Sequence, residues 1–126
     1  MLDLSKKGII NLHAISITRV NRNIQKMLCE DEEVISAFVT IRDQIVFTTK
    51  RIITVEVHGV TGTQQDIFTL PYRKIQYFGV KTAGIGEAIP DSELTLYFSD
   101  GRAAQFHFHD KVNIVDIGRV ISQNCL

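Results

Sequence analysis

The first part of the chain changes from no clear hydrophobic period to a helical one near Thr18. Residues 1–17 follow no firm pattern, so they form either a loose arm or a short element that packs on a neighbour. Beyond them, apolar residues recur at helical spacing at Val20, Ile24, Met27 and Leu28. With Ser16 or Thr18 as the N-cap, this spacing predicts an amphipathic helix. The acidic run Glu30–Glu33 ends it, because negative charge at a helix C-terminus opposes the helix dipole.

From Val34 the apolar residues alternate with a period of two, which is typical of β-strands. Segments rich in Val, Ile, Phe and Thr predict strands at Val34–Thr40, Gln44–Thr49, Arg51–Val57, Gln64–Leu70 and Ile75–Thr82. A hairpin follows, with Leu94, Leu96 and Phe98 alternating before the turn and Ala104, Phe106 and Phe108 after it. Asp100-Gly101 in its turn is a pair favoured in tight hairpins. Residues 83–91 form the longest predicted loop.

Helical spacing returns after Asp110, which we predict as an N-cap. The apolar stripe of this second helix consists of Ile114, Ile117 and Ile121, with Val120 beside it. Gly118 either costs this helix about 1 kcal/mol relative to alanine or allows close packing on a strand.

The order helix, seven strands, helix predicts a mainly β (α+β) fold. Short strands joined by turns form an antiparallel barrel or sandwich, and the final helix buries its isoleucines by capping the open end. At 126 residues and without a linker, the chain is one structural domain. Within it we expect an N-terminal arm and amphipathic helix in residues 1–33, and the barrel with its C-terminal helix in residues 34–126.

Composition disfavours several classes of partner. The chain has 14 basic and 14 acidic residues, whereas nucleic-acid and anionic-membrane binding require an excess of positive charge. Two cysteines, Cys29 and Cys125, are too few to staple a domain, and we interpret them as thiols. The segment after Lys6-Lys7 lacks the uninterrupted apolar run and the clear cleavage site of a signal peptide. No run of apolar residues approaches the ~20 that a membrane span requires. We therefore expect a cytoplasmic protein.

Short motifs along the chain resemble the bacterial pleckstrin-homology (PH) domain family. They are Arg42-Asp43, Ile45, Phe47-Thr48, Lys50-Arg51-Ile52, Gly59-Val60-Thr61-Gly62, Leu70–Ile75, Phe78, Thr82-Ala83-Gly84 and Asp91–Leu94. The ordered set spans roughly residues 34–126. The resemblance implies a PH-like seven-stranded barrel and a tendency toward ring-shaped homo-oligomers, and it implies no defined reaction.

Candidate catalytic and metal-binding residues are few. His107 and His109 lie two apart on a strand, so both side chains emerge on one face and could converge on zinc or nickel. No second Cys or Asp cluster completes such a site. Acidic neighbours disfavour an activated thiolate at Cys29, and Cys125 lies next to the chain end, so neither makes a credible nucleophile. The sequence predicts no enzyme, no cofactor and no metal.

Lipid recognition is an alternative that the PH resemblance raises. In lipid-binding relatives a basic loop between the first two barrel strands grips the headgroup. Here that connection is only Thr40–Asp43, where we expect Arg42 and Asp43 to pair or to cap the turn. Lys50-Arg51 and Arg73-Lys74 are short basic pairs of the kind that are usually solvated.

Binding to other protein chains is the function that remains. Residues 52–55 and 75–80 are apolar on both faces of their strands, so part of that surface should meet another subunit or the terminal helices. The candidate contact residues are Ile53, Val55, Tyr72, Arg73, Tyr77, Val20, Ile24 and Met27. We expect a non-enzymatic module that self-associates into a ring-like homo-oligomer, with another protein or peptide as an alternative partner. A monomer whose N-terminal helix covers this surface, and a peripheral membrane or lipid-headgroup module, are the alternatives.

Overall fold

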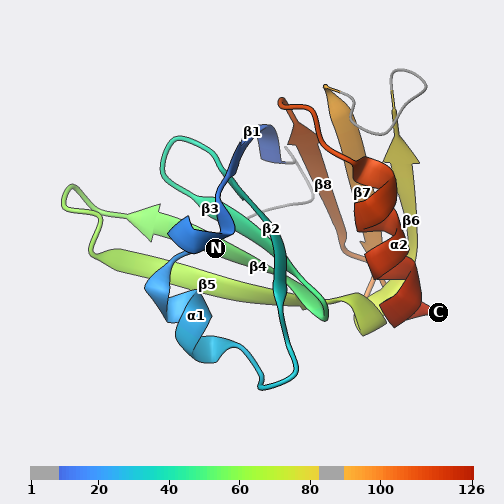
Figure 1. The fold of residues 1–126 in the computed structure, drawn as a ribbon, viewed down its shortest axis with the longest axis horizontal. Coiled ribbons are helices and arrows are strands. Elements are labelled where there is room, and N and C mark those ends of the chain that lie inside the picture. Colours follow the sequence, from blue (N-terminus) through green and yellow to red (C-terminus); the bar gives the residue numbers. More distant parts are fainter. Residues whose placement is uncertain (1–8, 83–89) are drawn as a thin grey trace.

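The computed structural model describes residues 9–82 and 90–126 as one β-sheet with short helices (Figure 1). Its strands are β1 (Ile9–Ile15), β2 (Val34–Val39), β3 (Gln44–Thr48), β4 (Arg51–His58), β5 (Gln64–Pro71), β6 (Ile75–Lys81), β7 (Ser92–Phe98) and β8 (Ala103–Phe108). Its helices are η1 (Ile17–Arg19), α1 (Arg22–Met27), η2 (Tyr72–Lys74) and α2 (Ile114–Cys125). The predicted mainly β class with a C-terminal helix is confirmed. Most of the predicted loop at 83–91 lies outside the described residues.

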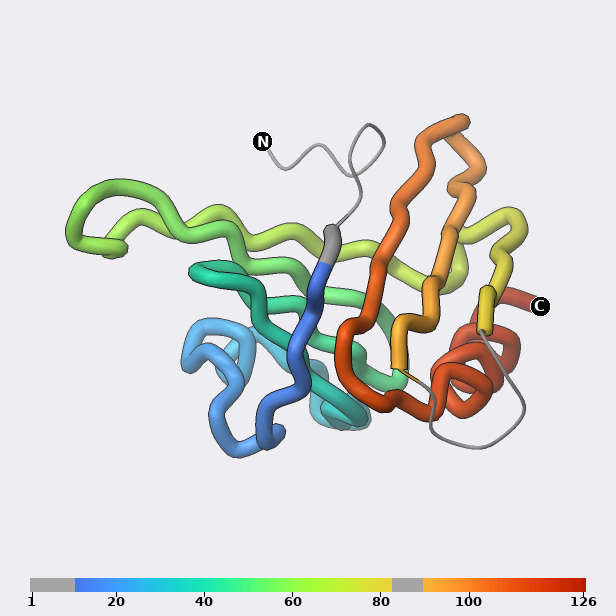
Figure 2. Tube along the Cα trace, turned by 90° about the horizontal axis from the view of Figure 1, so that it is seen from above, coloured from blue at the N-terminus to red at the C-terminus, as the bar shows by residue number. Residues whose placement is uncertain are grey.

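The sheet consists of two antiparallel sets of strands that meet at β1. Its order is β5-β4-β3-β2-β1-β8-β7-β6. β1 runs antiparallel to β2, with His13 opposite Val39, and parallel to β8, with Leu12 opposite Phe108. Figure 2 shows β1 passing between the two sets. The described residues therefore contain eight strands, one more than predicted, and the sheet crosses the expected boundary between arm and barrel at residue 33.

Asn11 explains why the sequence pattern conceals β1. Its backbone is left-handed, with φ 57°, a conformation that asparagine tolerates better than most residues. The β1–β8 register shifts between Ile9 and Leu12, around this residue. An extra residue in one strand breaks the alternation of apolar and polar positions, so the segment shows no period of two.

The predicted N-terminal helix is divided into two short helices, and Ser16, one of the two predicted N-caps, caps the first of them. The segment divides into η1, where the Ser16 hydroxyl accepts a hydrogen bond from the Thr18 amide, and α1, which Asn21 caps by accepting from the Asn23 amide. At the C-terminal end Asn113, not Asp110, caps α2 by accepting from the Asp116 amide. Asp110 is used elsewhere, because its carboxylate accepts a hydrogen bond from the Ala14 amide at 2.7 Å.

Two hydrophobic clusters lie on opposite faces of the strands β2–β4. The larger one fills the space between the two sets of strands and α2, and it includes the predicted helix stripe Ile114, Ile117 and Ile121. The smaller one lies under η1 and α1, where Val20 and Ile24 pack with Ala37, Val46, Ile53 and Val55. β3 and β4 are therefore covered on both faces within one chain. Across the described residues, no helix has the length and apolar character that a membrane span requires.

Gly118 on α2 lies over β6, and its environment predicts that alanine is tolerated there. An added Cβ would meet Val80 at 3.6 Å and Phe78 at 3.7 Å, which are ordinary contacts. We therefore expect Gly118→Ala to raise the free energy of unfolding by about 0.5–1 kcal/mol, because alanine loses less backbone entropy in a helix. Urea unfolding measures this change.

Gly101 in the β7–β8 turn provides the control. Its φ of +90° is strained for any residue with a Cβ, so Gly101→Ala should lower the free energy of unfolding by about 1–2 kcal/mol. If Gly118→Ala unfolds at lower urea than the parent chain, α2 packs more tightly on β6 than these distances indicate.

Candidate functional site

Most of the predicted contact residues lie inside the molecule. Val20, Ile24, Ile53 and Val55 are at most 4% exposed and pack on one another in the smaller cluster. Tyr72 is fully buried, and its hydroxyl donates to the Thr48 carbonyl at 2.7 Å. Four of them are covered because the N-terminal helices pack on that face of the sheet, whereas Tyr72 is covered within the larger cluster, so these five residues do not form a contact surface. The alternative in which the helix covers it within one chain describes this face correctly.

The other three predicted contact residues are accessible. Met27 at the end of α1 is 46% exposed, and Arg73 in η2 is exposed as well. Tyr77 on β6 is 59% exposed and stacks on Tyr97 of β7, with ring centroids 4.3 Å apart and an interplanar angle of 12°. A flat aromatic pair at the end of the sheet is a surface of the kind that protein interfaces favour.

The β2–β3 connection, which we considered above for lipid-headgroup binding, is fastened to the end of β4. Arg42 donates to the Gly59 carbonyl at 2.6 Å, and the Asp43 carboxylate accepts from the Val57 amide at 2.9 Å. Both residues therefore fasten the β2–β3 turn to the end of β4. The expected roles, a pair with each other or a cap of their own turn, are therefore replaced by contacts of both side chains with the neighbouring end of β4.

A buried ion pair anchors the connection between α1 and β2. Both guanidinium contacts from Arg51 to Glu32 measure 2.9 Å, and the Thr48 hydroxyl also donates to this carboxylate. The Glu32 side chain is completely covered. Burial by itself would raise the pKa of Glu32, but the hydrogen bonds from Arg51, Thr48 and the Cys29 amide lower it to about 2. These contacts hold the α1–β2 connection in place, and they leave neither Glu32 nor Arg51 free to act as an acid or a base.

A shallow cavity of about 360 Å³ lies beside this pair. Its lining residues are Cys29, Glu32, Lys50, Arg51, Thr69, Pro71, Arg73 and Asn124. Two of its three basic side chains already have acidic partners, since Lys50 contacts Asp31 at 2.9 Å and Arg51 contacts Glu32. The cavity therefore presents little free positive charge to an anionic ligand.

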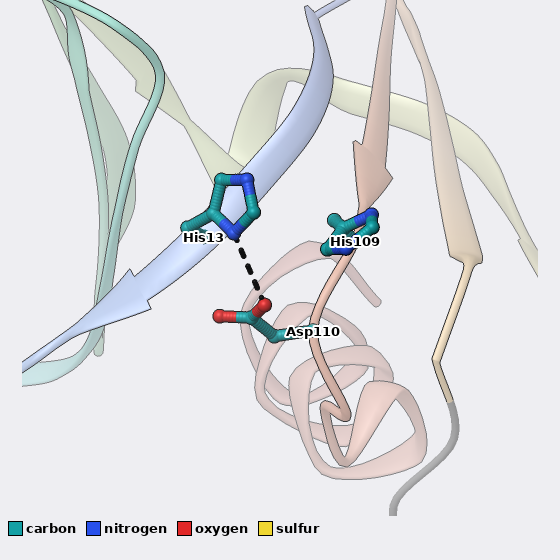
Figure 3. Close-up of side chains that lie close together, drawn as sticks. All are labelled: His13, His109 and Asp110. Atoms are coloured by element: carbon teal, nitrogen blue, oxygen red, sulfur yellow. Dashed lines mark hydrogen bonds and ion pairs between the residues drawn. The ribbon is translucent and has the colours of Figure 1, made fainter.

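The most chemically distinctive cluster joins β1 to the end of β8 (Figure 3). His13 lies on β1, while His109 and Asp110 follow β8. The Nδ1 atom of His13 is 3.2 Å from Oδ1 of Asp110, and the two imidazole rings have centroids 4.8 Å apart. One nitrogen from each histidine and one carboxylate oxygen lie within 4.8 Å of one another. The hydrogen bond from the Ala14 amide lowers the pKa of Asp110, which favours its ionised form.

This cluster changes the pairing that the sequence suggested. His107 has different partners, because its Nδ1 accepts from the Asn11 amide at 3.2 Å and its Nε2 is 3.3 Å from Asp91. His109 is joined instead by His13 and Asp110. An aspartate therefore does stand beside one of the two histidines. The sequence offers no local signal for His13, since it is 97 residues from Asp110 and β1 itself lacks a strand pattern.

A second cluster lies near the outer end of the β4–β5 pair. The Nε2 atom of His58 is 2.9 Å from Asp66 and 3.6 Å from Glu56. Glu56 and Asp66 face each other across the two strands. The imidazole lies between the two carboxylates, so an ordinary cross-strand polar contact accounts for this group.

Comparisons with known proteins agree on one family. The family described as "Bacterial PH domain" matches residues 3–125. The "Uncharacterized protein YjqA" of Bacillus subtilis (strain 168) is 36% identical over 118 residues, which cover 92% of this chain and 93% of YjqA. Neither description names an enzyme.

Two crystal structures from Shewanella share the fold. A DUF1696 family protein with a pleckstrin-homology domain from Shewanella loihica PV-4 superposes with a TM-score of 0.72 at 28% identity, covering 93% of this chain and 99% of that one. A pleckstrin homology domain from Shewanella amazonensis SB2B gives a TM-score of 0.59 at 29% identity, with 89% and 90% covered. These matches confirm the resemblance seen in the sequence.

The Glu32–Arg51 pair generates a stability prediction. Glu32→Gln leaves Arg51 with weaker partners, so we expect the free energy of unfolding at pH 7 to fall by about 3 kcal/mol. The pKa of Glu32 is lowered from 4.5 to about 2 in the folded chain, so its ionised form favours folding above pH 4.5. That contribution is lost as the pH falls toward 2. Urea unfolding of both proteins at pH 7 and pH 3 should show the difference shrinking.

The exposed pair between Asp31 and Lys50 is the control for this measurement. Asp31→Asn removes a neighbouring carboxylate that is well solvated, so its effect at pH 7 should be small. Equal losses for the two substitutions would show that burial of Glu32 contributes nothing.

Proposed function

Because the chain belongs to the bacterial PH domain family, we propose that it is a non-enzymatic binding module that self-associates through the edges of its sheet into a ring-like homo-oligomer. The observation that carries this proposal is the open sheet. Among the described residues, β5 pairs only with β4 and β6 pairs only with β7. Each chain therefore has one free edge at either end of its strand order.

Free edges favour association because they leave backbone N–H and C=O groups without strand partners. The β5 and β6 edges differ in sequence, so pairing one with the other is a head-to-tail contact. Repeated head-to-tail contacts close into a ring when the rotation between subunits permits it. This supports a cyclic assembly in preference to a dimer with a two-fold axis.

The side chains of β6 support its use as a contact edge. Tyr77 is exposed, and Gly79 has no atom within 4 Å of the position that a Cβ would occupy. A glycine in an edge strand allows another backbone to approach closely. β5 carries mainly polar exposed residues over Gln64–Asp66, so backbone hydrogen bonds would supply much of the pairing there. An extended peptide from another protein could use the same edges.

The proposal is tested by the solution mass of the full chain, measured by light scattering over a concentration series. We expect a discrete multiple of the single-chain mass that is stable on dilution. Tyr77→Lys removes the stack on Tyr97 and places a charge on the β6 edge, so this variant should shift toward the monomer. Circular dichroism and urea unfolding establish that it still folds.

Ile41→Lys is the matched control. Ile41 is fully exposed in the turn between the interior strands β2 and β3, so the same charge there should leave the mass unchanged. A parent chain that is monomeric at every concentration would overturn the proposal. If that monomer bound anionic vesicles at low salt and dissociated from them at high salt, the membrane-binding alternative would replace the self-association proposal.

A further inference from the structure

We propose that His13, His109 and Asp110 bind a divalent transition-metal ion, with zinc as the first candidate. Two imidazole nitrogens and one carboxylate oxygen are a donor set that zinc accepts, with water or another ligand at a fourth position. Magnesium and calcium prefer oxygen ligands alone, and the cluster contains no thiolate for a softer ion. This site is independent of the proposed self-association.

Backbone hydrogen bonds hold the residues that carry the ligands. The His109 amide donates to the Leu12 carbonyl at 2.9 Å, and the Ala14 amide donates to Oδ2 of Asp110 at 2.7 Å. These two bonds flank His13 on β1 and fix it opposite the end of β8. Supporting hydrogen bonds of this kind orient metal ligands and raise affinity. They also leave Oδ1 of Asp110 turned toward His13.

The distances suit a tetrahedral ion after a small movement of one side chain. Bonds of about 2.0–2.1 Å place two ligands of a tetrahedral zinc about 3.3 Å apart. Nδ1 of His13 and Oδ1 of Asp110 are already 3.2 Å apart. The remaining ligand atoms lie within 4.8 Å, and His109 is exposed, so rotation of its imidazole can bring a nitrogen closer.

The second cluster provides an internal comparison. It has one imidazole and two carboxylates, and Nε2 of His58 is already directed at Asp66, 2.9 Å away. A metal ion would have to displace a contact between an imidazole and a carboxylate in either cluster, but here that contact involves the only imidazole. The His13 cluster has two imidazoles for one carboxylate, so only one of its rings is held by the acid.

Metal binding at this place would couple the two sets of strands. β1 is the strand that joins β2 to β8, and the proposed ligands come from both sides of the β1–β8 pair. An ion that binds the folded chain and not the unfolded chain raises thermal stability by mass action. We expect saturating zinc to raise the melting temperature by about 5 °C or more.

The test is titration of the untagged, chelator-treated full chain with zinc chloride, followed by calorimetry and by metal analysis after dialysis. We expect one zinc per chain. His13→Ala and His109→Ala should each weaken binding at least tenfold and abolish the rise in melting temperature. His58→Ala and His107→Ala are matched controls that should bind as the parent chain does.

The outcomes separate the proposal from a purely structural ion pair. The His13 side chain is 54% exposed, so the melting temperature of His13→Ala without zinc should stay close to that of the parent. No zinc uptake by the parent chain would overturn the proposal. Uptake that survives both His13→Ala and His109→Ala, or that is lost only in His58→Ala, would overturn it equally.

Discussion

The pairing of β1 with two partners holds this sheet together. β2–β5 and β6–β8 are each a run of antiparallel neighbours, and among the described residues they are hydrogen-bonded into one sheet only through β1. β1 is antiparallel to β2 and parallel to β8, and its paired residues in β8 lie 96 and 97 positions away along the chain. Long-range pairing of this kind pays loop-closure entropy before it gains contacts, so we expect β1 and β8 to associate late in folding.

The position of β1 determines which surfaces remain available. With β1 at the centre of the strand order, β5 and β6 become the two ends of an open sheet. On β2–β4 both faces are occupied, one by the larger cluster and the other by the N-terminal helices, and α2 packs on β6 and β7. The surface that remains for association therefore lies at the two ends of the sheet, at β5 and at β6 with its exposed Tyr77. The same joint also brings together His13, His109 and Asp110, the side chains best suited to bind a metal ion.

The sequence predicts the parts of this structure that depend on local pattern. Seven strands, the β7–β8 hairpin and the isoleucine stripe of α2 follow from periodicity and turn chemistry. β1 was missed because the left-handed Asn11 breaks its alternation. The contact surface was misassigned at Ile53 and Val55 because a strand that is apolar on both faces can be covered by another chain or by its own helix. Pattern alone does not distinguish these two solutions. The pairing of His13 with Asp110 depends on a long-range register that no local spacing reveals.

Hydrogen exchange of the backbone amides in β5 and β6 tests the central claim, edge-to-edge association, most directly. At concentrations where chains associate, the account predicts that edge amides exchange as slowly as those of the interior strand β3, and that this protection is lost in the Tyr77→Lys variant. Amides in β5 and β6 that exchange faster than β3 at every concentration would contradict it, because the two edges would then remain open to water.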